Sequence, residues 1–472
     1  MKNMNITEEV ALFVANTRYE DIPLAVVHET KRLILDTIGC ALGGVGTTKG
    51  DIAVRLARSL GGPPEASLLG TQDRISAANS AFATGELMNA LDYEALLSPP
   101  DHATPYVLAA PFAMGEKKDV SGAELIAATA IAHELATRLA ASLDFGRRFT
   151  MKLPERGLTM SMPTPGYGLC AIAGAAAAGR IMGMDADKIA HAMGLAGYMA
   201  PVPMLMKFAT TVPAALAKYQ SAGALSLQEV LSVMWADMGC TGDKEILDGD
   251  YGFWRALGCD DWTPEVLTKD LGKQWLFPMR LFYKKFPCCG AMQNALALFS
   301  DILTERDLSP DDITALTIKL NPLAELPLWR NERIENHVDA QFNTPYVFAA
   351  VANRLEIGPS WQMEEAFNDD GITRFMKKVR VVTDLDNHTR RRPQVEVTVG
   401  KGTAKKVFSG DGVARSLIMD DKVLAEKFRK NTRTILAEEQ TEKAISLIFR
   451  LEHCTRIAEL ISCLSPNPDK PE

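Results

Sequence analysis

The chain has 472 residues, 47% of them apolar and 23% charged, and a formal net charge of −8. This composition is that of a globular protein, and the length suits about two large domains. The acidic balance and the lack of a long basic run argue against nucleic acid as a partner. The N-terminal residues lack the apolar core of a signal peptide, and no uncharged apolar run is long enough to span a membrane. We therefore expect a cytoplasmic protein without membrane contact.

Helical periodicity extends from residue 6 to about residue 275. Thr7, followed by two glutamates, is expected to open the first helix, and Gly43-Gly44 to end the second. Further helices are expected at 77–91, 121–143, 168–183, 186–198 and 213–235. Many of these segments are rich in alanine and glycine, and small residues let helices pack closely, which predicts a helical bundle.

The pattern changes after Pro278. β-Branched runs predict strands at 313–320, 379–382, 395–399 and 404–408, which indicates a smaller α+β domain. The segment from 420 to about 464 is helical again and has no core of its own, so it is expected to pack on the first bundle. The predicted fold is therefore mostly α. Residues 1–279 together with 412–472 form the helical domain, and 280–411 form the α+β domain.

Eight cysteines stand at positions 40, 170, 240, 259, 288, 289, 454 and 463. None are spaced Cys-x-x-Cys as zinc or iron–sulfur sites require, so we expect reduced thiols and no metal. The segment 171–183 has no preceding strand and no Gly-x-Gly-x-x-Gly, so no nucleotide cofactor is expected either.

A proline-broken loop after residue 90 carries acidic residues and one histidine. Asp92 and His102 in this loop could form a general acid/base pair, because imidazole titrates near neutral pH and a carboxylate can orient it. The alternative is a helix-capping aspartate and a surface histidine.

Two lysines and one tyrosine are further candidates. Lys207 lies among apolar neighbours and either extends to solvent or binds an anion in a cleft. Lys284 lies where the helical part meets the mixed part, either as a carboxylate-binding group or as an ordinary surface charge. Tyr346 lies near a helix start marked by Pro345, either in the core or with its hydroxyl toward a ligand.

Five segments match the motifs of one known family. They are Tyr19-Glu20-x-Ile22-Pro23, Lys31-Arg32-x-Ile34-Leu35-Asp36-x-Ile38-Gly39, Leu91-Asp92-Tyr93, Lys284-x-Phe286-Pro287-Cys288-Cys289 and Pro345-Tyr346. Over nearly its whole length the chain resembles the MmgE/PrpD proteins, which include 2-methylcitrate dehydratase, cis-aconitate decarboxylase and iminodisuccinate epimerase. The resemblance implies a large helical domain, a smaller α+β lid, an active site between them and a homodimer. It also implies which residues form the active site: Asp92, His102, Lys207, Lys284 and Tyr346.

Several family positions differ in this chain. Where many relatives have Asp-Phe-Asp-Asp-Thr and a later His-Pro, this chain has Asp92-Tyr93-Glu94-Ala95-Leu96 and Ser98-Pro99. A histidine of the family falls on Met162, another on Thr210, and an arginine and a histidine fall on Gly290 and Gln293. The lysines are kept while histidines are lost, so we expect anion binding to be kept and the substrate or reaction type to differ.

The leading hypothesis is cofactor-independent dehydration of a small 3-hydroxy polycarboxylate similar to 2-methylcitrate. Lys207 and Lys284 would hold carboxylates and stabilise the enolate-like charge, and Asp92 and His102 would transfer protons. Tyr346 would hydrogen-bond a carboxylate or the leaving group. The alternatives are an epimerase or isomerase, a decarboxylase of a related di- or tricarboxylate, and a carboxylate-binding protein without turnover.

Overall fold

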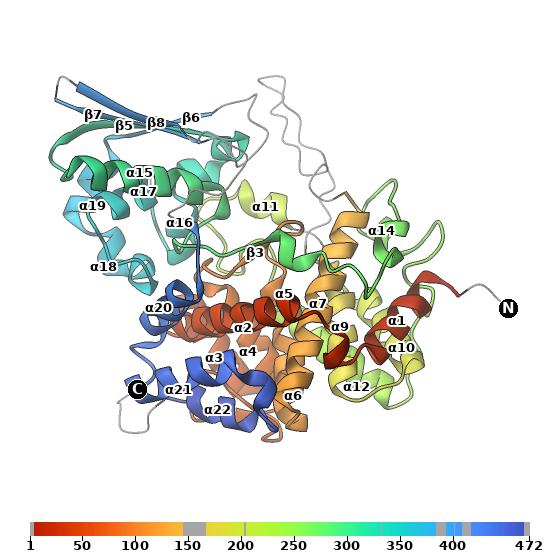
Figure 1. Cartoon of the computed structure of the whole chain (residues 1–472). Coiled ribbons are helices and arrows are strands. Elements are labelled where there is room, and N and C mark those ends of the chain that lie inside the picture. The colour runs from red at the N-terminus through yellow and green to blue at the C-terminus, as the bar shows by residue number, and fades with distance from the viewer. Residues whose placement is uncertain are drawn as a thin grey trace.

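The structure is a computed structural model that describes residues 4–144, 167–202, 204–331, 333–383, 393–400, 402–407 and 417–466 (Figure 1). For residues 402–407 only the backbone is described. Met162 and the predicted domain bound at residue 411 lie outside the described residues, so both domain bounds stay predictions. No helix in the described segments is both long and apolar enough to cross a membrane.

The first part of the chain is helical, as the sequence predicts. Its longer helices are α1 (Ile6–Asn16), α2 (Leu24–Gly44), α3 (Thr48–Leu60), α4 (Ala77–Ala90), α6 (Ala109–Lys118), α7 (Gly122–Ser142), α9 (Cys170–Ile181), α10 (Ala186–Met199) and α12 (Ala222–Asp237). Its shorter ones are α5 (Thr104–Val107), α11 (Leu205–Ala209), α13 (Phe253–Ala256) and α14 (Glu265–Thr268). Two-residue strands β1 (Ala66–Ser67) and β2 (Arg74–Ile75) pair between α3 and α4. The first helix starts one residue before the predicted Thr7, because the Asn5 side chain accepts a hydrogen bond from the Glu8 amide and caps it.

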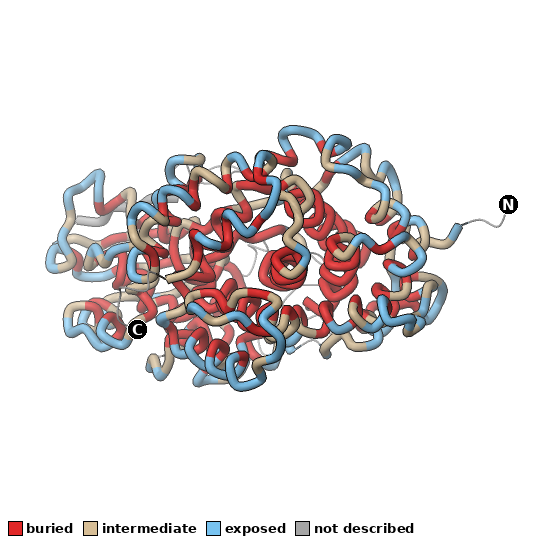
Figure 2. The backbone as a smooth tube through the Cα atoms, turned by 90° about the horizontal axis from the view of Figure 1, so that it is seen from below, coloured by how far each residue is buried: buried red, intermediate tan, exposed pale blue. Residues whose placement is uncertain are grey.

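Small residues set the distance between the central helices. A Cβ on Gly85 of α4 would lie 3.0 Å from the Ala222 backbone, and one on Gly223 of α12 would lie 2.2 Å from the Phe82 carbonyl oxygen. The two helices therefore cross in backbone contact, which a larger side chain would prevent. Figure 2 shows the result, with buried backbone through the middle of the molecule and exposed segments at its edge.

A four-stranded sheet forms in the second part of the chain. Its order is β6-β5-β7-β8, with β5 (Ile313–Leu320) parallel to β6 (Val379–Thr383), and β7 (Gln394–Val399) antiparallel to both β5 and β8 (Gly402–Val407). Helices α15 (Gln293–Arg306), α17 (Thr344–Ala352) and α19 (Asp370–Met376) lie on one side of this sheet (Figure 1). The shorter helices α16 (His337–Phe342) and α18 (Glu364–Phe367) lie between the sheet and the bundle.

The last helices return to the beginning of the chain. They are α20 (Asp421–Thr432), α21 (Glu438–Phe449) and α22 (Ala458–Leu464). Helix α20 packs along α2, where a Cβ on Gly39 would lie 2.9 Å from the Phe428 ring. The expected packing of the tail on the N-terminal bundle is confirmed by these contacts.

One predicted helix begins later than expected. Residues 213–221, taken from the sequence as the start of a helix, are irregular, and α12 begins at Ala222. The Ser221 hydroxyl accepts a hydrogen bond from the Ala224 amide at 3.0 Å and caps the helix there. The irregular segment runs beside the end of α4, where it contributes a lysine to the candidate site.

Candidate active site

The site begins at the end of α4. Asp92 has a left-handed backbone with φ of 52°, a conformation that aspartate adopts more readily than most residues. This turn directs the chain away from the helix axis immediately after the helix ends. The Asp92 side chain is 0% exposed, so its charge needs partners inside the protein.

Two lysines from distant segments supply these partners. The Lys218 ammonium lies 2.6 Å from Asp92 Oδ1 and 3.0 Å from the Asn89 carbonyl oxygen. The Lys284 ammonium lies 2.8 Å from Asp92 Oδ2 and 2.6 Å from the Asp92 carbonyl oxygen. Each lysine holds one carboxylate oxygen, so the aspartate is fixed on both sides.

A short strand pair brings Lys284 to this place. Strand β3 (Leu96–Leu97), in the loop after Asp92, pairs antiparallel with β4 (Leu281–Phe282), two residues before Lys284. Backbone hydrogen bonds thus tie the loop to the segment of the second lysine. The sequence signal for this pairing is absent, because two-residue strands have no periodicity.

The charges of Asp92, Lys218 and Lys284 set one another's protonation states. Burial acts to raise the pKa of Asp92, but the Lys218 and Lys284 ammoniums outweigh burial and hold that pKa well below its ordinary value. Burial lowers the pKa of Lys218 to about 8 despite the nearby Asp92 carboxylate. For Lys284 burial is outweighed by the Asp92 and Glu94 carboxylates, and its pKa is raised. Asp92 is therefore a carboxylate, and Lys218 is the cation closest to losing its proton near neutral pH.

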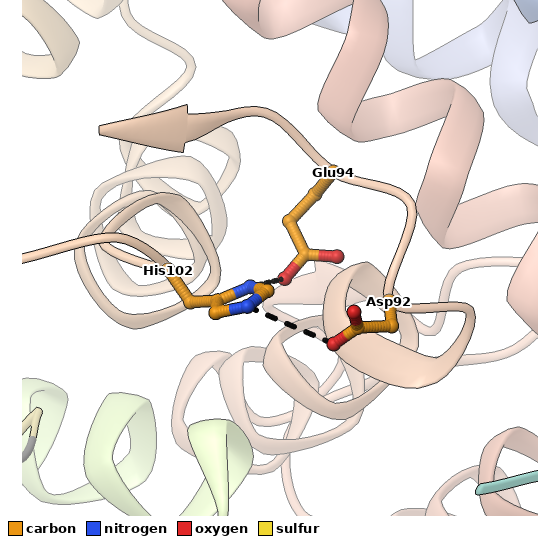
Figure 3. Close-up of side chains that lie close together, drawn as sticks. All are labelled: Asp92, Glu94 and His102. Atoms are coloured by element: carbon orange, nitrogen blue, oxygen red, sulfur yellow. Dashed lines mark hydrogen bonds and ion pairs between the residues drawn. The ribbon is translucent and has the colours of Figure 1, made fainter. Parts of the chain in front are cut away.

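Figure 3 shows His102 between two carboxylates. Its Nδ1 lies 2.6 Å from Glu94 Oε1, and its Nε2 lies 3.7 Å from Asp92 Oδ1. The imidazole and the Lys218 and Lys284 ammoniums lower the pKa of Glu94 to about 2, although burial opposes them. Glu94 thus stays ionised and fixes the orientation of the ring, which is the arrangement that a histidine acid/base needs.

Aromatic rings and one amide enclose the histidine. The Tyr219 ring centroid lies 5.0 Å from that of His102, and the Tyr167 ring meets His102 edge-on at 6.0 Å. The Asn89 amide donates to Glu94 Oε1 and to the Tyr219 hydroxyl, both at 2.9 Å. The His102 ring therefore lies buried among aromatic rings and charged groups, where electrostatic interactions are strong.

A buried ion pair from the tail supports the site from behind. The Lys427 ammonium lies 2.7 Å from Asp36 Oδ1, and it donates to the carbonyl oxygens of Tyr93 at 2.7 Å and Lys284 at 3.0 Å. Asp36 Oδ2 accepts from the Ala95 amide at 3.0 Å. The pair thus links α2, α20, the Asp92 loop and the Lys284 segment.

Asp92, Glu94 and His102 also have the donor atoms of a metal site, since one ligand atom from each lies within 4.8 Å of the others. Both oxygens of Asp92 are held by ammonium groups, however, and Glu94 Oε1 is held by the histidine and by Asn89. A divalent cation at Asp92 would have to displace these contacts against two positive charges. Glu94 Oε2, in contrast, has no hydrogen-bond partner among the described residues.

Comparison with known proteins decides the family. The family model of the MmgE/PrpD N-terminal domain matches residues 8–265, and that of the C-terminal domain matches residues 286–452. The chain belongs to the MmgE/PrpD family.

Curated relatives are similar over almost their whole length. The cis-aconitate decarboxylase of Homo sapiens is 24% identical over 99% of this chain and 96% of the relative. The cis-aconitate decarboxylase of Aspergillus terreus is 22% identical over 98% of this chain and 96% of the relative. A cis-aconitate decarboxylase-like protein of Aspergillus oryzae is 23% identical over 98% of this chain and 97% of the relative. The MmgE/PrpD resemblance predicted from the motifs is thus confirmed, and these relatives are named for the decarboxylation of cis-aconitate.

Three of the five residues expected from the MmgE/PrpD motifs lie together, namely Asp92, Lys284 and His102. Lys207 lies exposed on α11, and its ammonium makes no ion pair with another described residue. Tyr346 is buried, and its hydroxyl donates to the Trp361 carbonyl oxygen at 2.5 Å. In this structure Tyr346 is therefore a packing residue that anchors a neighbouring backbone.

Sequence reasoning missed Lys218 and Tyr219, and it gave Glu94 no role. Lys218 was hidden inside the helix expected at 213–235. A serine at 221 before a run of small residues is a helix-start signal, and it would have left Lys218 in a loop. Tyr219 lies in the same loop, and its hydroxyl lies 3.3 Å from Asp92 Oδ1.

Gln293, which replaces a family histidine, has a structural contact set. Its amide donates to the Phe286 carbonyl oxygen at 2.8 Å, and its Oε1 accepts from the Lys285 and Phe286 amides at 3.1 Å. The side chain therefore fixes the turn after Lys284. Here the histidine is replaced by a residue suited to holding backbone and unable to transfer a proton.

Proposed function

We propose that this protein is a cofactor-independent lyase that removes carbon dioxide from a small unsaturated di- or tricarboxylate, with His102 as the proton donor. The observation that carries the proposal is the placement of His102 between Glu94 and Asp92, beside two buried lysines. The names of the relatives support decarboxylation over other reactions of the family.

The chemistry requires a cation and one proton. When the bond to the departing carboxylate breaks, its electron pair stays on the carbon skeleton and is delocalised toward a remaining carboxylate. Lys218 and Lys284 would stabilise this enolate-like charge. The protonated form of His102 then gives its proton to carbon, and Glu94 stabilises the imidazolium before that transfer. One imidazole is sufficient for this sequence, which agrees with the loss of family histidines.

Dehydration of a 3-hydroxy polycarboxylate, the leading hypothesis from the sequence, is the second candidate. It needs a base that takes the α-proton as well as an acid that protonates the leaving hydroxyl. The pKa of about 8 at Lys218 favours this candidate, because such a lysine is a usable base near neutral pH. His102 would then be the acid.

The proposal includes the remaining expectations from the sequence. Lys207, exposed on α11, is proposed to bind a carboxylate of the incoming substrate. The sequence also suggests that Tyr346 hydrogen-bonds a substrate carboxylate or the leaving group. Because its hydroxyl donates to the Trp361 carbonyl oxygen, Tyr346 is proposed instead to hold that backbone. A homodimer, which the family resemblance suggests, and a cytoplasmic location are also part of it.

The test is a substrate panel followed by proton NMR in deuterated water. Chelator-treated protein is incubated with cis-aconitate, 2-methylcitrate, citrate, and amino- and hydroxydicarboxylates. Carbon dioxide release with one deuterium placed on carbon supports decarboxylation, and a new double bond supports dehydration. Deuterium uptake without loss of mass would instead indicate epimerisation. Thermal stabilisation without turnover of any compound would indicate a binding protein.

Matched variants assign the reaction to the site. His102→Gln should lower kcat by about 100-fold or more, because general acid catalysis contributes roughly that much. His28→Gln is the control, since the His28 side chain is half-exposed and forms an ion pair with the half-exposed Asp421. Equal activity in both variants would overturn the role of His102.

A further inference from the structure

His337, the first residue of α16, has a buried imidazole without partners. Its side chain is 3% exposed, and neither ring nitrogen has a hydrogen-bond partner among the described residues. Buried polar groups are nearly always paired, and an unpaired one costs free energy. The buried His133 follows that rule, with Nδ1 at 2.7 Å from the Thr129 carbonyl oxygen and Nε2 at 3.2 Å from the Thr104 hydroxyl. His337 thus keeps a donor and an acceptor free.

The helix of His337 is fastened to the segment that carries Lys218. The Asn336 amide donates to the Ala214 carbonyl oxygen at 3.0 Å, and the Ala214 amide donates to Asp339 Oδ1 at 2.8 Å. At the other end of α16, the Phe342 ring centroid lies 5.9 Å from the Lys218 ammonium. These contacts place α16 directly against the candidate site.

The charges around His337 are positive. Burial lowers the pKa of His337, and Lys49 and Lys218 lower it further, to about 3. The ring is therefore neutral at physiological pH and presents one N–H donor. Lys49 is itself buried and joined to the site, with its ammonium 3.4 Å from Asn89 Oδ1 and 2.9 Å from Glu86 Oε2. An anion beside His337 would thus meet cations on the bundle side and a free N–H on the α16 side.

We propose that His337 is a substrate-binding residue whose N–H donates a hydrogen bond to a carboxylate of the polycarboxylate, next to the ammonium of Lys218. This inference rests on the function proposed above and adds a recognition residue that the family motifs do not include. It explains why an imidazole with an unpaired N–H is kept in the interior, since the substrate supplies the missing acceptor. A neutral donor also binds the anion without adding a further charge to repel Lys49 and Lys218.

Histidine NMR on the intact protein tests the contact directly, because the chain has only seven histidines. Tricarballylate is a suitable probe, since it has three carboxylates but no hydroxyl and no double bond to react. The Cε1–H resonances of His337 and His102 are assigned by their loss in His337→Gln and His102→Gln. We expect both to shift with the same midpoint during a tricarballylate titration, while His28 stays in place.

The outcomes separate this inference from the proposed function. A His102 resonance that moves while His337 stays would overturn the inference and leave the function intact. Stationary resonances for both histidines, with no turnover of any panel compound, would overturn the polycarboxylate function and the inference with it. The wild-type spectra decide between these results even if a His337 variant folds poorly.

Kinetics provide the second readout. His337→Gln should raise KM by about 10-fold or more and change kcat by less than about 3-fold, because it removes a contact made in both the ground state and the transition state. His28→Gln should leave both constants unchanged. An unaltered KM in a folded His337→Gln variant would contradict a substrate contact.

Discussion

Asp92 and Lys218 form a buried ion pair of 2.6 Å between two residues that both have left-handed backbone, with φ of 52° and 58°. Such a conformation costs about 1–3 kcal/mol for a residue other than glycine and persists only where the surroundings hold it. Both residues accept this backbone cost, and their side chains form an ion pair. The surrounding structure therefore holds the two side chains in place at the expense of local backbone stability.

Affinity for tricarballylate should fall as the pH rises through about 8, because Lys218 has a pKa of about 8 and loses its positive charge above it. Lys218→Arg should keep the affinity to higher pH, since a guanidinium stays protonated. Calorimetric titrations between pH 6 and pH 10 measure this, with Lys188→Arg at an exposed ion pair as the control. A midpoint near pH 8 in the arginine variant would assign the titration to another group.

Replacing Lys218 and Lys207 in turn with methionine shows which of the two lysines matters more for activity. Lys218→Met should lower kcat/KM by about 100-fold or more, because it removes a buried cation beside the reacting charge. Lys207→Met should cost about 10-fold or less, since Lys207 is exposed and unpaired among the described residues. Steady-state kinetics on the substrate found by the panel measure both. The reverse order would show that Lys207 moves into the site when substrate binds.

Tyr346→Phe should destabilise the protein by about 1 kcal/mol and leave kcat/KM within about 3-fold, because the lost hydroxyl bonds the Trp361 carbonyl oxygen and no other group in the described part of the chain. The thermal midpoint and kcat/KM are measured together. Tyr251→Phe is the control, since Tyr251 is 95% exposed. A loss of kcat beyond 100-fold with an unchanged thermal midpoint would make Tyr346 a catalytic residue.

Lys427→Met should destabilise the protein by about 3–5 kcal/mol, because it leaves the buried Asp36 carboxylate without its counter-charge. Asp36→Asn combined with Lys427→Met should recover part of that loss, since no uncompensated charge remains. Arg429→Met at the exposed pair with Glu442 should cost less than about 1 kcal/mol. Thermal unfolding of these three variants and of Asp36→Asn alone checks this, and additive losses for Asp36 and Lys427 would refute the coupling.

The sequence predicted most helices and strands because their patterns are local. Periodicity and end signals located α4, α7, α9 and α10 and the strands of the sheet to within about two residues. The start of α12 was predicted wrongly. The helical pattern of the sequence continues through residues 213–221, but tertiary contacts hold this segment in an irregular conformation.

The site was predicted only where a motif marked it. Asp92, His102 and Lys284 stand in recognisable segments, whereas the role of Lys218 depends on a left-handed turn that no propensity shows. The contact between Lys427 and Asp36 joins positions far apart in the chain, and no local pattern can reveal it. Distances between remote residues follow from packing, which a single sequence does not display.

The contact between the second helix and the tail also orders the events of synthesis. The Asp92 loop and Lys284 emerge from the ribosome well before Lys427, and until α20 arrives the Tyr93 and Lys284 carbonyl oxygens lack their common donor. A growing chain therefore already contains the other residues of the candidate site before the Lys427 contacts can form. Domains generally fold as they are made, but the contacts of Lys427 with the candidate site can form only after the tail is synthesised. A chain that ends before α20 would therefore contain the side chains of the candidate site without the ion pair that links their segments.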